Sequence, residues 1–256
     1  MSVELKTEAE ISIMRRANML VHDTLQILAQ MAAPGVATND LDRRAREMLA
    51  QHNAQPAFLG YPSSSRSVAP FPGVICASRN EEIVHGIPND EPLRAGDILS
   101  IDFGTCLDGY YGDSAITVAI GEIGAEAKRL MDVTKQSLED AISQCVEGNR
   151  IGDVSYAVQS RAEKAGYGVV REFVGHGIGR NMHEAPQVPN FGRPNQGRVL
   201  KAGMVIAIEP MITEGSFETK ILGDGWTAVT KDGKLAAHFE HSVAITKRGP
   251  FVLSRP

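Results

Sequence analysis

Two stretches of this chain repeat one pattern, and the repeat limits the folds that the chain can adopt. LRAGDILSID occupies residues 93–102, and LKAGMVIAIE occupies residues 200–209. Each stretch has an Ala-Gly turn signal, a run of apolar residues typical of a strand, and a carboxylate at its last position, Asp102 or Glu209. A strand that runs into a core rarely ends on a charge, so we expect both strand-end carboxylates to serve one function.

Each copy of the motif follows two predicted helices. In the first half, Thr7 and Glu10 have the spacing of a capping box, and apolar residues then recur with helical period until Pro34 and Gly35. A second helix is predicted from 38 or 39 to 49.

The second half shows the same order. Helical periodicity runs from Leu130 through Val146 and stops at Gly148, and a shorter helix is predicted for 153–165. The order of helix, helix and strand-rich sequence therefore occurs twice, which indicates a duplicated α+β unit.

No linker, low-complexity run or break in composition separates the two units. We therefore expect one catalytic domain over residues 1–256, with internal halves of about 1–118 and 119–256 related by a pseudo-twofold axis.

Composition excludes several classes of function. The formal net charge is -5 and no block of Lys or Arg occurs, so we expect no nucleic acid and no anionic membrane as partner. No apolar run approaches the roughly 20 residues that span a bilayer. Cys76, Cys106 and Cys145 are odd in number and widely spaced, which favours neither disulfides nor a cysteine zinc site. We expect a cytoplasmic protein.

Four carboxylates are expected to meet between the halves. A hairpin signal, Asp-Gly at 108–109, brings Asp113 within cross-strand reach of Asp102. In the second half, Glu240 lies on a β-rich run that follows Glu209. Each half thus offers two carboxylates, and the pseudo-symmetry would gather all four.

Such a cluster needs protons or cations. Two like charges about 4 Å apart cost on the order of 4 kcal/mol at an effective dielectric near 20. Several such pairs would exceed much of the net stability of a domain, which is roughly 5 to 15 kcal/mol. Two divalent cations carry the charge that four carboxylates neutralise, so the count favours a dinuclear metal site.

Histidines add further candidates. His176 and His183 lie in FVGHGIGRNMHEAPQVPN, and His85 lies in the Gly/Pro-bounded loop EEIVHGIPN. One of them could be a metal ligand and another a hydrogen-bond donor in catalysis. His238 and His241 flank Glu240, and we expect them to point away from it, as residues behind the ligands or on the surface.

Two other site types fit poorly. The run GHGIG lacks the spacing of a dinucleotide-binding loop, and the serine of GDSA does not lie in a GxSxG elbow. Taken singly, each strand-end carboxylate is more often a turn former than a ligand. The metal hypothesis rests on their joint occurrence at repeat-related positions.

The chain resembles type I methionine aminopeptidases. The resemblance is carried, in order, by EEIVHGIPN, SIDFG, YYGDSA, GHGIGRNMHEAPQVPN, AIEPM, DGWT and HFEHS, and it extends over nearly the whole chain. It implies the α/β pita-bread fold of creatinase and the aminopeptidases, in which two pseudo-twofold-related halves surround a central dinuclear metal site.

The resemblance also implies the ligands. Asp113 and Glu240 would contact both ions, Asp102 would bind one ion, and His176 and Glu209 would complete the other. The metals would lower the pKa of a shared water, and Glu209 would take its proton and relay it to the leaving amine.

Two further histidines have roles by resemblance. His183 would donate a hydrogen bond to the scissile carbonyl, and His85 would contact the scissile amide. The substrate's free α-amine would lie near one metal. The implied reaction removes the N-terminal methionine of peptides and nascent chains, preferably before a small, uncharged second residue.

The pocket for the methionine side chain is also implied. Tyr61, Cys76 and Trp226 match the family, whereas Phe58, Phe71 and Met182 stand where some relatives have Cys, Tyr and Phe. All are apolar or polarizable, as a thioether requires. The loop 62–70, PSSSRSVAP, is longer than in compact relatives.

Several alternatives stay open. One imidazole among four carboxylates favours Mn or Fe(II), and Co and Zn also tolerate such ligands. We expect a monomer that acts on nascent chains at the ribosome. A proline-directed peptidase of the same fold would use the same ligands but commonly has an extra N-terminal domain, which we do not expect here. An inactive peptide-binding module would have lost ligands, and all five are present.

Overall fold

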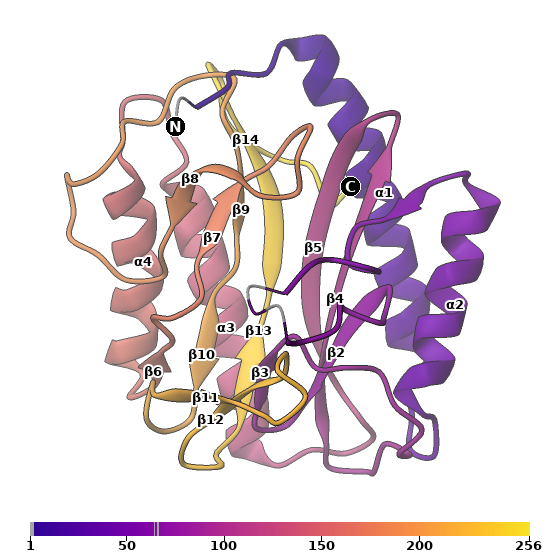
Figure 1. Cartoon of the computed structure of the whole chain (residues 1–256). Helices are drawn as coiled ribbons and strands as arrows, with labels where there is room; N and C mark the ends of the chain where they lie inside the picture. The colour runs from indigo at the N-terminus through magenta and orange to yellow at the C-terminus, as the bar shows by residue number, and fades with distance from the viewer. Residues whose placement is uncertain (1–2, 64, 66) are drawn as a thin grey trace.

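The computed structural model describes residues 3–63, 65 and 67–256, and these form four helices and fifteen strands (Figure 1). The helices are α1 (Glu8–Met31), α2 (Thr38–Gln51), α3 (Ala125–Ser143) and α4 (Ile151–Lys164). The strands are β1 (Gln55–Pro56), β2 (Ile75–Arg79), β3 (Glu82–Val84), β4 (Ile98–Leu107), β5 (Tyr110–Ala119), β6 (Gly168–Val169), β7 (Gly175–Gly177), β8 (Glu184–Val188), β9 (Val205–Ile208), β10 (Met211–Thr213), β11 (Thr219–Ile221), β12 (Ala228–Thr230), β13 (Ala236–His238), β14 (Glu240–Thr246) and β15 (Gly249–Val252).

One large sheet contains strands from both halves of the chain. Its order is β1-β4-β5-β14-β9-β7-β8, with β2 also paired to β4 and β15 to β14. The halves join where β5 pairs with β14, with Ala115 opposite Glu240 and Ser114 opposite His241. Two three-stranded sheets, β13-β10-β6 and β11-β12-β3, complete the strands described.

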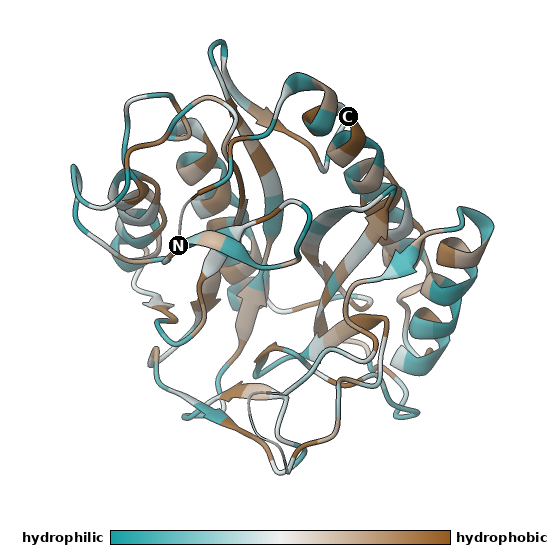
Figure 2. Cartoon of the chain, turned by 45° about the horizontal axis from the view of Figure 1, so that its top comes forward, coloured by the Kyte–Doolittle hydropathy of each residue, from teal (hydrophilic) through white to brown (hydrophobic). Residues whose placement is uncertain are grey.

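The helices lie in two pairs beside this sheet. Figure 1 shows α1 and α2 next to β4 and β5, and α3 and α4 next to the strands of the second half. In Figure 2 the strands between them are largely brown or pale, while the helices show teal outer sides. Buried apolar residues of α1, α2, β2 and β4 form one core cluster, and those of α3, α4, β9 and β14 form another. Within the described ranges, no helix combines the length and the apolar character that crossing a bilayer requires.

The first predicted helix pair is confirmed. Thr7 and Glu10 form the capping box, because the Thr7 hydroxyl accepts from the Glu10 amide and the Glu10 carboxylate accepts from the Thr7 amide. Helix α2 begins at Thr38, as predicted, and ends at Gln51, two residues beyond the predicted end.

The bounds of the second pair differ from the prediction. Helix α3 ends at Ser143, so Val146 lies outside it and is 42% exposed. The last turn tightens, since the amides of Gln144 and Cys145 donate three residues back rather than four. Helix α4 begins at Ile151, before the predicted Asp153, whose carboxylate instead accepts from the amide at position 150.

The predicted hairpin is present, but one strand runs further than expected. Asp108 and Gly109 both have positive φ, 52° and 77°, and form the two-residue turn between β4 and β5. Strand β4 continues to Leu107, so Asp102 lies in the middle of its strand and not at the end. Glu209 does follow the last residue of β9, as predicted. The repeated motif thus delivers its carboxylate at two different points of a strand.

Helix α1 packs directly on strand β5 at a glycine. A Cβ atom on Gly112 would lie 2.7 Å from the backbone nitrogen of Asn18 and 2.8 Å from the carbonyl carbon of Ala17. Helix backbone atoms cannot move aside as a side chain can, so this contact requires a residue without a Cβ.

Replacing this glycine tests the contact. We expect Gly112→Ala to lower the free energy of unfolding by about 1 to 3 kcal/mol, because the added methyl group forces α1 away from β5. Urea denaturation measures the change.

Gly223→Ala is the matched control, because nothing lies within 4 Å of the added Cβ there and the glycine does not have a positive φ. An equal loss of stability in both variants would contradict the close approach of helix and strand.

Candidate functional site

Strand register brings one carboxylate from each half onto the same face of the sheet. Leu99, Ile101 and Phe103 of β4 pack in the core cluster with α1 and α2. Because side chains alternate along a strand, Asp102 points to the opposite face. Ala115 of β5 lies opposite Asp102 on one side and opposite Glu240 of β14 on the other. The two carboxylates therefore flank one small residue.

Asp113 reaches the same face from β5. It lies two residues from Ala115 and pairs with Gly104 of β4. A Cβ atom on Gly104 would lie 3.2 Å from Asp113 Oδ1 and 2.9 Å from the Cβ of Ala57. A glycine opposite Asp113 therefore leaves room for the carboxylate.

Glu209 and His176 complete the group from β9 and β7. His176 pairs with Ala207, two residues before Glu209, so the two side chains share a face. His176 Nε2 lies 3.7 Å from Asp113 Oδ2 and 3.8 Å from Glu209 Oε1. The Asn190 amide donates to the backbone oxygen of Glu209 at 2.9 Å and fixes the chain where β9 ends.

His176 is arranged as a neutral ligand. Its Nδ1 lies 2.9 Å from the carbonyl oxygen of Gly177, so Nδ1 carries the proton and donates. Nε2 then presents a lone pair toward Asp113 and Glu209. Burial, followed by the nearby His183, lowers the pKa of His176 to about 3. The imidazole is therefore uncharged at neutral pH.

The cavity disfavours the ionised form of all four carboxyl groups. Burial is the main cause and raises the pKa of Asp102 to about 7. Burial and then the charges of neighbouring carboxylates raise the pKa values of Asp113, Glu209 and Glu240 well above the ordinary range. Within the described part of the chain, no Lys or Arg forms an ion pair with any of the four.

Unpartnered oxygens show that the site fits divalent cations. Asp102 Oδ1, Asp113 Oδ1 and Glu240 Oε1 are buried and have no hydrogen-bond partner among the described residues. Buried polar atoms without a partner are rare in folded proteins and call for an ion or water. Carboxylate oxygens and a neutral imidazole are ligands suited to Mn, Fe(II), Co or Zn.

The possible ligand atoms form two groups that share one residue. Asp113, His176 and Glu240 offer atoms within 4.8 Å of one another, and so do Asp102, His238 and Glu240. A residue common to both groups is what a bridging ligand between two ions would be.

All of the predicted site residues line one cavity of about 280 Å³. Its polar side holds the four carboxylates with His85, His176 and His183, and its other side is mainly apolar. The apolar lining consists of Phe58, Tyr61, Phe71, Cys76, Val84, Phe173, Val174, Met182 and Trp226.

Aromatic contacts shape the apolar side. The rings of Phe71 and Trp226 meet edge to face with centroids 5.2 Å apart. The Trp226 indole donates to the carbonyl oxygen of Ala69 at 2.9 Å, which ties the ring to the loop 62–70. Two residues of that loop, Ser64 and Arg66, lie outside the described part of the chain.

The two remaining histidines border both sides of the cavity. His183 stacks obliquely against His176 with centroids 4.3 Å apart, and its Nδ1 lies 2.7 Å from the hydroxyl of Tyr61. His85 has a φ of 61°, a strained value for a residue with a side chain, as is common at functional sites. Burial lowers the pKa of His85 to about 4.

Three lining residues and one histidine were missed or misplaced by the sequence analysis. Val84, Phe173 and Val174 line the cavity next to predicted residues, and Phe173 lies edge to face with His85 at 5.4 Å. His238 is 1% exposed and lies on the side of Asp102 and Glu240, so its prediction as a residue facing away was wrong. Residues two apart on extended chain share a face, which is the signal that could have placed it.

Comparisons with known proteins identify relatives that match nearly the whole of this chain. Residues 12–247 match the family model of metallopeptidase family M24. The methionine aminopeptidase of Clostridium acetobutylicum is 49% identical over 251 residues, which cover 98% of each chain. The crystal structure of methionine aminopeptidase from Thermotoga maritima has a TM-score of 0.95 at 40% identity and covers 100% of both chains.

A more distant likeness concerns the fold alone. The prolidase from Pyrococcus horikoshii has a TM-score of 0.78 at 19% identity, and the match covers 98% of this chain but 63% of the prolidase.

The raised pKa of Asp102 predicts how the metal-free protein responds to pH. A group whose pKa is raised by folding stabilises the folded state below its ordinary pKa, here 3.8, and that contribution is lost as pH rises through about 7. We therefore expect the free energy of unfolding of Asp102→Asn to exceed that of the unaltered protein by an amount that grows from pH 4 to pH 7 and reaches up to ~4 kcal/mol. Urea denaturation with EDTA at each pH measures the difference.

Adding Mn²⁺ should remove most of this difference, because the cation neutralises the carboxylates without protons. Asp23→Asn is the control, since Asp23 is an exposed carboxylate of α1 outside the cavity. A stability difference for Asp102→Asn that stays constant from pH 4 to pH 7 would show that burial does not raise the pKa of Asp102.

Proposed function

This chain belongs to metallopeptidase family M24. We propose that it removes the N-terminal methionine of peptides and proteins, and that the reaction takes place in the cavity described above. The full-length similarity to methionine aminopeptidases confirms the predicted resemblance, the pita-bread fold and the activity as a methionine aminopeptidase. The observation that carries the assignment to this cavity is the meeting of four carboxyl groups and a neutral imidazole beside an apolar pocket.

We propose two divalent ions, held by five side chains. Asp113 and Glu240 would contact both, Asp102 would bind one, and His176 and Glu209 would complete the other. The sharing of Glu240 between two possible ligand groups supports this count. When bound, the ions supply a water of lowered pKa at neutral pH and neutralise negative charge that develops on the substrate.

Glu209 is the proposed proton carrier. Its carboxylate lies at the end of β9, faces the cavity and is close to the imidazole of His176. It takes the proton of the attacking water and delivers it to the amine that leaves. The hydrogen bond from the Asn190 side chain to the backbone oxygen of Glu209 fixes the backbone from which this carboxylate extends.

His183 is the proposed donor to the scissile carbonyl. With the Tyr61 hydroxyl donating to Nδ1, the ring proton lies on Nε2, where it can stabilise the oxyanion. His85, at the border with the apolar lining, contacts the scissile amide.

The apolar lining accounts for the choice of methionine. Phe71, Cys76, Met182 and Trp226 line the cavity, and polarizable or aromatic surfaces favour a thioether. We propose that a small, uncharged second residue is preferred, as the similarity to methionine aminopeptidases implies.

The proline-directed alternative is not favoured. Its support is a match to prolidases at 19% identity, whereas methionine aminopeptidases match at 40% to 49% over the whole chain. A binding module without activity would not need the complete set of ligands that lines the cavity.

We propose that the chain acts as one catalytic unit, because strands of both halves share one sheet. The three cysteines are free, which favours the cytoplasm as the compartment. A monomeric state and action on nascent chains at the ribosome stay predictions.

Glu209→Gln tests the proposed role of the carboxylate. We expect kcat for methionine release from Met-Ala peptides to fall by about 10² to 10⁴-fold, because the amide cannot accept the proton. Release of methionine in the presence of Mn²⁺ measures the rate, and the metal content of the variant is determined in parallel.

Control measurements separate this role from a general loss of structure. Asp23→Asn should keep full activity, and the unaltered enzyme should act faster on Met-Ala than on Met-Leu. An active Glu209→Gln variant refutes the proton relay, and an enzyme that cleaves only peptides with proline in second position supports the alternative.

A further inference from the structure

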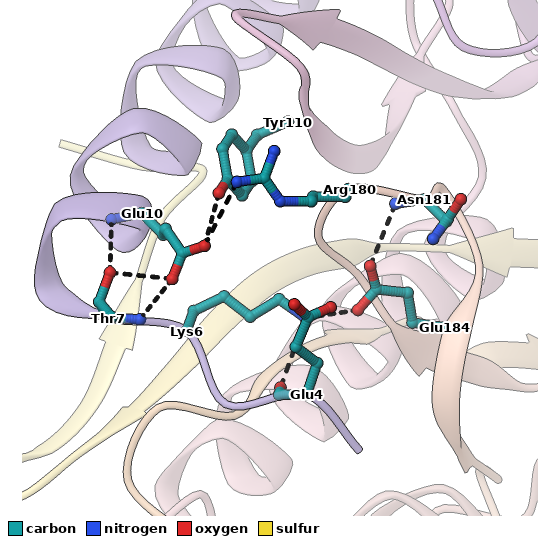
Figure 3. A network of polar contacts seen from close by, with 8 residues as sticks. All are labelled: Glu4, Lys6, Thr7, Glu10, Tyr110, Arg180, Asn181 and Glu184. Carbon is teal, nitrogen blue, oxygen red and sulfur yellow. Dashed lines mark hydrogen bonds and ion pairs between the residues drawn. The ribbon is translucent and has the colours of Figure 1, made fainter. Parts of the chain in front are cut away.

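The turn between β7 and β8, residues 178–183, carries two residues of the cavity. Met182 lines the apolar side, and His183 faces the proposed metal ligands. Neither residue lies in a strand, so neither is held in place by backbone pairing of its own. Figure 3 shows what surrounds this turn: the segment before α1 and the first turn of α1 lie against it.

Lys6 and Glu184 form the inner contact of this network. The Lys6 ammonium donates to Glu184 Oε2, and the two side chains are 3% and 10% exposed. The other oxygen of the same carboxylate, Oε1, accepts from the backbone amide of Asn181 at 3.1 Å. One carboxylate therefore joins the N-terminal segment to the backbone of the turn, next to His183.

The ion pair rests directly on the backbone. A Cβ atom on Gly179 would lie 2.7 Å from Lys6 Nζ and 2.8 Å from Glu184 Oε1. The Gly179 carbonyl accepts from the amide of Tyr111 at 2.8 Å, so the other side of the turn is fixed to β5. The turn is thus confined between β5 and the ion pair.

A second, exposed contact holds the next residue. Arg180 lies 3.6 Å from Glu10 Oε1 and stacks over the ring of Tyr110 at 4.5 Å. The Tyr110 hydroxyl donates to the same Glu10 oxygen at 2.6 Å. Figure 3 shows both contacts on the side of the turn that faces α1.

Lys6 also contacts the turn that leads to Glu209. Its backbone amide donates to the carbonyl oxygen of Gly203 at 2.7 Å, in the Lys-Ala-Gly turn before β9. Lys6 therefore contacts both the turn that carries His183 and the turn before β9, the strand that leads to Glu209.

A buried ion pair is weak evidence of a contribution to stability, because desolvation offsets the attraction. We propose that Lys6 and Glu184 are positioning residues that set the turn so that His183 meets the scissile carbonyl. This inference rests on the role proposed above for His183. Small misplacements of a catalytic group lower rates strongly, so the pair acts mainly on kcat.

The test removes the ion pair without leaving a lone buried charge. We expect Lys6→Met/Glu184→Gln to lower kcat on Met-Ala about tenfold, while Mn²⁺ affinity stays unchanged because the five proposed ligands lie elsewhere. In a His183→Ala background, the same double substitution should lower kcat no further, since its effect passes through His183. Hydrogen exchange at the Asn181 amide should become faster.

Controls keep the test decisive. Lys128→Met/Asp132→Asn removes an exposed pair of α3 and should leave kcat unchanged. If the double variant does not fold, Lys6→Arg replaces it, because arginine keeps the charge but needs more room beside Gly179. We expect Lys6→Arg to lower kcat when His183 is present and to lower it no further in the His183→Ala background.

Two results would overturn the inference: an unchanged kcat in the double variant, or an equal fall with and without His183, which is what a purely structural role produces. Full activity of His183→Ala by itself would refute the proposed role of His183, and this inference with it. Failure of the proposed role of His183 can be told from failure of this inference alone, because the His183→Ala variant leaves Lys6 and Glu184 unaltered.

Discussion

The burial of four carboxyl groups in one cavity governs how this protein is built. Burial raises the pKa values of Asp102, Asp113, Glu209 and Glu240, and the charges of neighbouring carboxylates raise those of Asp113, Glu209 and Glu240 further. Among the described residues, no Lys or Arg forms an ion pair with any of the four. Three of their oxygens are buried and unpartnered. Each added negative charge is costly in such surroundings, so the folded chain holds either protons or cations there. The proposed enzyme uses the second possibility.

The fold meets this constraint through a sheet that both halves share. Antiparallel register places Ala115 between Asp102 and Glu240, and Gly104 opposite Asp113, so small residues leave space where the carboxylates converge. The helices support the opposite face of these strands, and among the described residues no side chain that lines the cavity comes from a helix. His183 lies in a turn and not in this sheet. The contact of Lys6 with Glu184 joins the N-terminal segment to that turn, and in our proposal it positions His183 for the reaction.

Sequence reasoning predicted the two helix pairs, the first capping box and the convergence of the carboxylates, because each depends on local pattern and on periodicity. It placed Asp102 at a strand end, whereas β4 runs on to Leu107, since pairing with β1 and β5 extends the strand beyond its apolar run. It put His238 on the wrong face. The contact of Lys6 with Glu184 joins residues 178 positions apart and has no periodic signal, so only the three-dimensional structure reveals it.

Anomalous X-ray diffraction from crystals grown with Mn²⁺ tests whether the buried carboxylates hold two ions. We expect two anomalous peaks about 3.5 to 4 Å apart in the cavity. Asp113 and Glu240 should lie within bonding distance of both peaks, and His176 within bonding distance of one. Crystals with no peak in the cavity at saturating Mn²⁺, or with a single peak that Glu240 does not contact, would contradict the proposal of two ions.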